Sequence, residues 1–247
     1  NVVNATYGDT TGISNYHSLQ VSAERRFSKG LGWLGSYTYS HSIDNVPLQQ
    51  GGGVDGPMPQ AIRYRFLDRA TSGFDIKHRT SQSVIYDLPL GKGRHFSISN
   101  SFANAIFGGW QVNGILTVQT GLPFTPTLAT SVSNSGGSRP DCLTSGGVAN
   151  PTITHWFDTS FNTSGSAWAT PRQYTYGNGG RNTLRGPGRT NLDFSAFKVI
   201  PVTERCQLQF RGEFFNIFNH PQFDLPNATI GSAAAGVISS TVGSPRD

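Results

Sequence analysis

The chain of 247 residues is long enough for one large all-β domain or two small ones. Only 13% of its residues are charged, whereas an average soluble domain has about 25%. Its formal net charge of +5 comes from Lys and Arg residues that are scattered along the chain, which argues against nucleic acid as a partner. Its aromatic content of 11% argues against disorder.

The first strands are predicted by strict alternation of apolar and polar residues, which is typical of a strand with two different faces. Residues 16–27 and 33–43 alternate in this way, and a short turn at 28–32 joins them into a β-hairpin. Aromatic residues near the strand ends are what an interfacial girdle of a membrane barrel needs.

The periodicity is lost between residues 44 and 77, where prolines and Gly51-Gly-Gly predict a long loop. The spacing of Arg65 and Arg69 indicates a short helical turn inside this loop. A strand resumes at 80–88, and residues 95–107 fit either a short strand or a small helix at 101–106.

The second half of the chain repeats the pattern of two-faced strands separated by a long loop. Strands are predicted at 110–120, 191–199 and 204–218, the last with Phe210, Phe214 and Phe218 on its apolar side. Residues 121–188 are rich in Pro, Ser, Thr, Gly and Asn, and loops of this length are usually functional.

Loop lengths are asymmetric, because short turns at 28–32 and 200–204 alternate with the long loops. This asymmetry is typical of outer-membrane barrels. In a barrel, residues 44–77, 121–188 and 219 onward would be extracellular, and 89–109 would be periplasmic. The lumen would then be lined by the polar sides of the strands, namely Gln111, Asn113, Asn191, Asp193, Gln207, Gln209, Arg211 and Glu213.

The sequence offers little catalytic chemistry. The six histidines share no metal-binding spacing, no GxSxG motif occurs, and the two cysteines, Cys142 and Cys206, lack CxxC spacing. Asp193 and Glu213 are interpreted as structural partners of Arg211 rather than as a catalytic pair. We therefore expect no enzyme activity, no metal and no cofactor. A disulfide between the cysteines would contradict the barrel, because they belong to opposite rims.

Ligand-binding residues are predicted in the long loops, where aromatic and Arg side chains suit a sugar, a peptide or a siderophore. The alternative is that these residues pack the loop onto itself. The candidates are Trp156, Phe157, Trp168, Arg172, Tyr174, Tyr176 and Arg181.

Several motifs together resemble a known family. They include Tyr86-Asp-Leu-Pro, Gly108-Gly-Trp-Gln-Val-Asn-Gly, Gln119-Thr-Gly-Leu-Pro-Phe and Arg211-Gly-Glu-Phe-Phe-Asn-Ile-Phe-Asn-His. In their order, they resemble the carboxy-terminal barrel of TonB-dependent outer-membrane receptors. The closest type is the Oar-like kind abundant in acidobacteria, which carries a carboxypeptidase-regulatory-like domain at its amino end.

The resemblance implies an all-β, antiparallel transmembrane β-barrel segment with long extracellular loops. Residues 1–247 would supply about six to eight strands of a 22-stranded barrel, without the plug and the last strand, and both ends look like cuts through a longer protein.

It also implies a location in the bacterial outer membrane and contact with outer-membrane lipid. The function would be TonB-driven uptake, through the missing plug, of an unknown small ligand, glycan or peptide. The alternatives are a secreted β-sandwich that binds or acts on polysaccharide, and a self-assembling surface or fibre protein.

Overall fold

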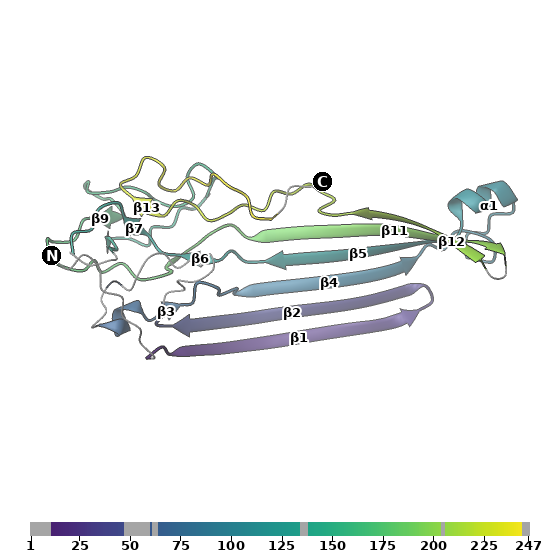
Figure 1. Cartoon of the computed structure of the whole chain (residues 1–247), viewed down its shortest axis with the longest axis horizontal. Coiled ribbons are helices and arrows are strands. Elements are labelled where there is room, and N and C mark those ends of the chain that lie inside the picture. Colours follow the sequence, from purple (N-terminus) through teal and green to yellow (C-terminus); the bar gives the residue numbers. More distant parts are fainter. Residues whose placement is uncertain (1–10, 47–59, 61–63, 134–137, 204–205, 244–247) are drawn as a thin grey trace.

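The computed structural model describes residues 11–46, 60, 64–133, 138–203 and 206–243. Its main element is a seven-stranded antiparallel sheet in which six strands follow one another as β1-β2-β4-β5-β11-β12 and the short β3 pairs with β2 (Figure 1). The strands are β1 (Ser14–Ser28), β2 (Leu31–Asp44), β3 (Ala70–Thr71), β4 (His78–Asp87), β5 (Trp110–Gln119), β11 (Arg189–Thr203) and β12 (Cys206–Phe214). This up-and-down order confirms the predicted all-β antiparallel class.

The hairpin of β1 and β2 confirms the first predicted pair of strands, and its turn explains where the pairing begins. Lys29 and Gly30 have φ angles of 52° and 81°. Two successive residues in this region make the type of turn that matches the twist of paired strands. Ser28 therefore pairs with Leu31 across the turn. The register then shifts between Ser28 and Arg25, and the pairing continues from Arg25 and Trp33 to Ser14 and Asp44 at the far end of the hairpin.

The last strand of the main sheet is shorter than the alternation predicts. β12 ends at Phe214, and Asn216 and Asn219 then adopt φ angles of 46° and 50°. Asparagine tolerates this left-handed backbone, which cannot continue a strand. The prediction that Phe218 lies on the apolar face of the strand was therefore wrong. β11 also extends through Pro201 to Thr203, where the sequence predicts a turn.

Strand register divides the sheet into two faces, because directly paired residues of antiparallel strands point to the same side. The polar face carries all the residues predicted to line a lumen, Gln111, Asn113, Asn191, Asp193, Gln207, Gln209, Arg211 and Glu213. The apolar face carries Val21, Trp33, Tyr37, Val84, Tyr86, Trp110, Val112, Leu116, Phe194, Phe210 and Phe214.

The apolar face is not covered by a second layer in the part of the chain that the structure describes. Val21 and Phe210 remain 54% and 56% exposed, and the cluster of buried hydrophobic residues lies outside the long strands. A β-sandwich needs its apolar strand faces to close onto a core. The sandwich alternative therefore does not fit the sheet.

The two ends of the sheet differ, as the loop lengths predict. The turn between β1 and β2 lies at one end, together with the connection 88–109 and its helix α1 (Ser101–Phe107), which resolves the ambiguity over residues 95–107 (Figure 1). The long connections after β2, β5 and β12 gather at the opposite end. No helix among the described residues is long and apolar enough to span a membrane.

The long connections form a packed unit that we call the loop cap, made of residues 64–77, 120–133, 138–188 and 215–243. Its core consists of Phe124, Phe157, Ala167, Trp168 and Ile230. The cap contains the 3₁₀ helix η1 (Arg65–Asp68) and three short strand pairs. These are β6 (Pro123–Phe124) with β10 (Leu184–Arg185), β7 (Thr127–Leu128) with β13 (Thr229–Ile230), and β8 (Asp141–Cys142) with β9 (Trp168–Ala169).

The cap leans over the polar face of the sheet. Near the end of β2, Ser40, Ser42 and Asp44 are buried, whereas Tyr39 and His41 on the apolar side are exposed. The Ser42 hydroxyl lies 2.9 Å from that of Ser72 in the cap. The long loops thus close over the side of the sheet that the sequence predicts to be the lumen.

Candidate functional site

Three arginine–aspartate pairs fasten the loop cap together. Arg139 pairs with Asp68, Arg181 with Asp44 and Arg185 with Asp75. Each pair joins the loop after β5 to the end of β2 or to the loop that follows it. Because these segments are far apart in the sequence, the pairs determine how the cap is assembled.

Arg181 was predicted to bind ligand, but its guanidinium is occupied inside the cap. It is 3% exposed, and it pairs with the Asp44 carboxylate. It also donates to the backbone carbonyls of Asp44, at 2.9 Å, and Asp68, at 3.0 Å. A ligand outside the cap cannot reach this group, so we assign Arg181 a structural role.

Arg139 is held in the same way and was missed by the sequence analysis. Its guanidinium donates to the Asp68 carboxylate at 3.0 Å and to the Gln60 Oε1 at 2.8 Å. Burial lowers the pKa of Arg139 from its ordinary value, and Asp68 opposes part of that shift. An arginine remains charged despite such a shift, so the pair with Asp68 is an ion pair.

The predicted tryptophans are also part of the cap interior. Trp168 is 1% exposed and donates through Nε1 to the Asp158 carbonyl. Trp156 is half-buried and donates to the Arg185 carbonyl at 2.8 Å. Phe157 lies between Phe124 and Trp168, with ring centroids 5.5 and 6.5 Å away. These aromatic residues therefore pack the loop onto itself, which was the alternative to ligand binding.

The remaining predicted ligand-binding residues lie together on a short exposed turn, residues 172–176. Arg172, Tyr174 and Tyr176 are all exposed, Tyr174 to 76%. Tyr174 has a φ of 61°, which is rare for a bulky residue and is often found at functional positions. Its N–H donates to the Val132 carbonyl at 2.8 Å, which fastens the backbone of the turn to the rest of the cap.

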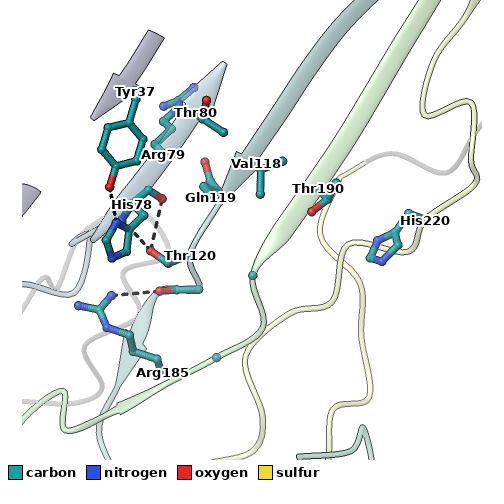
Figure 2. A pocket seen from close by; sticks show the side chains of 13 residues that line it. Tyr37, His78, Arg79, Thr80, Val118, Gln119, Thr120, Arg185, Thr190 and His220 are labelled. Atoms are coloured by element: carbon teal, nitrogen blue, oxygen red, sulfur yellow. Dashed lines mark hydrogen bonds between the residues drawn. The ribbon is translucent and has the colours of Figure 1, made fainter. Parts of the chain in front are cut away.

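A second feature, which we call the rim cavity, lies where the cap meets the sheet and has a volume of about 630 Å³ (Figure 2). Tyr37 from β2 and His78 from β4 point toward one another there, with 2.8 Å between Oη and Nδ1. Its lining also includes Thr80, Val118, Thr120, Arg185, Thr190 and His220.

The rim cavity opens on the apolar side of the sheet, since Tyr37, His78, Thr80, Val118 and Thr190 all project from that face by register. The Arg185 guanidinium is held by Asp75 and by the Gly121 carbonyl, 3.1 Å away. No local motif could reveal this cavity, because its residues come from several strands and loops.

A smaller hollow of about 330 Å³ lies on the polar face, between β4, β5, β11 and β12. Glu213 pairs with Arg211 there, as predicted. Asp193 does not pair with Arg211, because its Oδ1 accepts from the Asn216 N–H and from Asn191 Nδ2, both at 2.9 Å. The Oδ1 atom of Asn113, which also lines the hollow, has no hydrogen-bond partner among the described residues.

The described part of the chain contains neither a metal site nor a disulfide. It contains no group of three or more His, Cys, Asp or Glu that could hold a metal ion. Cys142 and Cys206 are both free thiols, and they lie at opposite ends of the sheet. This separation agrees with the prediction that they belong to opposite rims.

Comparison with known proteins gives one result that covers the whole chain. A family model described as "Outer membrane beta barrel domain" matches residues 1–247. The comparisons with curated proteins and with solved structures give no match.

Proposed function

The chain belongs to the outer membrane beta barrel domain family and to the bacterial outer membrane, and from this premise we propose that it is part of a TonB-driven receptor that takes up a ligand. In this proposal, residues 1–247 are the carboxy-terminal portion of an Oar-like, 22-stranded barrel. The apolar face meets outer-membrane lipid, and the polar face lines the lumen. A plug outside this chain couples the barrel to TonB.

The observation that supports ligand capture is the exposed turn at residues 172–176. It presents Arg172, Tyr174 and Tyr176 to solvent, and the packed cap beneath it is fastened by buried ion pairs. Rigid aromatic rings beside an arginine lose little entropy when they bind. A sugar, a peptide or a metal chelate could stack on the tyrosines while the guanidinium donates hydrogen bonds to an anionic or carbonyl group of the ligand.

The position of the turn also favours it over the rim cavity as the capture surface. The rim cavity opens on the apolar face, which in a barrel is the lipid side. A ligand from the medium meets the cap first. We therefore propose binding at the turn followed by passage along the polar face, with no catalytic step.

The test uses cells that carry the complete gene, either unchanged or with Arg172, Tyr174 and Tyr176 all replaced by alanine. Fluorescent oligosaccharides, short peptides and iron chelates are offered in turn, and surface binding and uptake are measured separately. We expect one class to bind, the triple variant to lose at least about tenfold in affinity, which corresponds to about 1.4 kcal/mol, and a protonophore to block uptake without blocking binding.

The matched control is Tyr64→Ala, because Tyr64 is an exposed tyrosine of the cap that lies outside the turn. It should bind as the unchanged protein does. Uptake that continues in the presence of the protonophore would indicate a passive channel instead of a TonB-driven receptor. Unchanged binding in the triple variant would exclude the turn as the capture surface.

A further inference from the structure

The connection between β4 and β5, residues 88–109, is an ordered unit at the end of the sheet opposite the loop cap (Figure 1). Asn100 caps α1, since its Oδ1 accepts from the N–H groups of Phe102 and Ala103 at 2.9 and 3.0 Å. Asn104 accepts from the Lys92 N–H at 2.8 Å, which ties the helix to the start of the connection. The orientation of α1 is therefore fixed by hydrogen bonds within the connection.

The carboxyl end of α1 is fastened to the apolar face of the sheet. The Ile106 carbonyl accepts from Lys198 Nζ at 3.0 Å and from Trp110 Nε1 at 2.8 Å. Trp110, Lys198 and Phe210 are cross-strand neighbours on that face. Lys198 is only 6% exposed, and its Nζ lies 5.3 Å from the centroid of the Trp110 ring. A positive charge at this position stabilises the carboxyl end of the helix.

The outer side of α1 is apolar and has no protein partner among the described residues. Phe102 is 76% exposed, Phe107 is 59% exposed, and Ile106 is exposed as well. Phe96, just before the helix, is also exposed. Residues 88–109 contain no Asp or Glu, but they do contain Lys92, Arg94 and His95. Arg94 pairs with Asp87 at 3.4 Å, whereas Lys92 is exposed. The connection thus combines exposed aromatic rings with an exposed basic side chain.

We propose that α1 lies in the membrane interface, with Phe102, Ile106 and Phe107 inserted among the lipids and Lys92 facing anionic headgroups. An amphipathic helix beside a lipid surface is stabilised by buried apolar area and by basic residues. The apolar face to which Ile106 is fastened is the one that a barrel turns to lipid, so the helix surface and the lipid-facing surface are continuous. A bilayer of anionic phospholipid is therefore the occupant of this helix face.

The inference rests on membership of the barrel family and not on TonB-driven uptake. Its test is a depth measurement on the complete protein in vesicles of phosphatidylcholine and phosphatidylglycerol. All other cysteines are replaced by serine, and a nitroxide is attached to Phe102→Cys. Collisions of the nitroxide with oxygen, which concentrates in lipid, are compared with collisions with a water-soluble nickel chelate.

We expect oxygen collisions to dominate at position 102 and nickel collisions to dominate at Tyr174→Cys, the control in the loop cap. Adding Lys198→Met should shift position 102 toward nickel, because α1 loses one of the two donors that hold it to the apolar face. Nickel dominance at position 102 would overturn the proposal by placing the helix in water. Protection from both reagents would also overturn it, by showing that protein covers the helix. Neither result would affect the uptake measurements.

Discussion

Arg181 in the loop after β5 pairs with Asp44 at the end of β2, and the two residues are separated by 137 positions in the sequence. Both side chains are almost fully buried. The loop cap is therefore attached directly to the end of a barrel strand and does not depend on loop-to-loop contacts alone. This attachment makes the orientation of the exposed turn sensitive to residues that never contact a ligand.

Replacing Asp44 with alanine should open the cap. Removing one partner of a buried ion pair leaves an uncompensated charge and costs about 3–5 kcal/mol. We expect faster cleavage of the loop after β5 by protease added to intact cells, with unchanged amounts of protein in the outer membrane. The matched control is Arg211→Ala, whose ion pair with Glu213 is exposed and contributes about 0–1 kcal/mol. Equal cleavage in the two variants would contradict the role given to Asp44.

Trp168 should be the most sensitive single position of the cap core. Replacement with alanine should destabilise the cap by about 3–5 kcal/mol, because a buried aromatic side chain leaves a cavity. Trp168→Phe retains most of the packing and loses the hydrogen bond to Asp158, which costs about 1 kcal/mol. Urea unfolding followed by near-ultraviolet circular dichroism measures both changes. If Trp168→Ala lowers the free energy of unfolding no more than Trp168→Phe does, the cap core does not depend on this side chain.

Two substitutions at Tyr174 distinguish the effect of backbone strain from the effect of losing the contact with ligand. Tyr174→Gly should leave the stability of the cap nearly unchanged, because glycine adopts a φ of 61° without steric cost. It should nevertheless weaken ligand capture. Tyr174→Val should weaken capture as well but also destabilise the cap by about 1–2 kcal/mol, because a β-branched residue fits this backbone poorly. Thermal unfolding and surface binding, measured on both variants, distinguish the two effects.

The cysteines test which rim faces the medium. Burial raises the pKa of the Cys142 thiol, so less thiolate is present at neutral pH, and its reaction with a maleimide should accelerate as the pH rises. On intact cells, an impermeant maleimide should label Cys142 slowly and should not label Cys206 at all, since Cys206 lies at the opposite end of the sheet. Labelling of Cys206 alone would reverse the orientation that we propose.

The strands could be predicted because the information for them is local. Alternation in residues 16–27 and 110–120 is a direct result of two faces in different surroundings. β1 covers the first range, and β5 covers the second to within one residue. The prediction for Phe218 was wrong, because period-two spacing continues past Asn216 while the backbone there turns left-handed. A pattern of side chains does not report such a change of backbone.

The cap could not be predicted in the same way. Trp168 and Tyr174 are aromatic residues in one Pro-, Ser- and Gly-rich segment, yet one is buried and the other is exposed. What separates them is a set of contacts with distant parts of the chain, such as those of Arg139 and Arg181 with the region around Asp68. Composition identifies the segment as rich in potential ligand contacts but cannot tell which side chains the fold uses for itself.

The buried core lies in the loop cap, while the apolar face of the sheet remains open. The two parts of the protein are therefore stabilised by different solvents. Water drives the cap together through the hydrophobic effect, whereas the sheet depends on hydrocarbon to surround its exposed side chains. The protein should consequently melt in two stages, with lipid chain length controlling the transition of the sheet and urea controlling that of the cap.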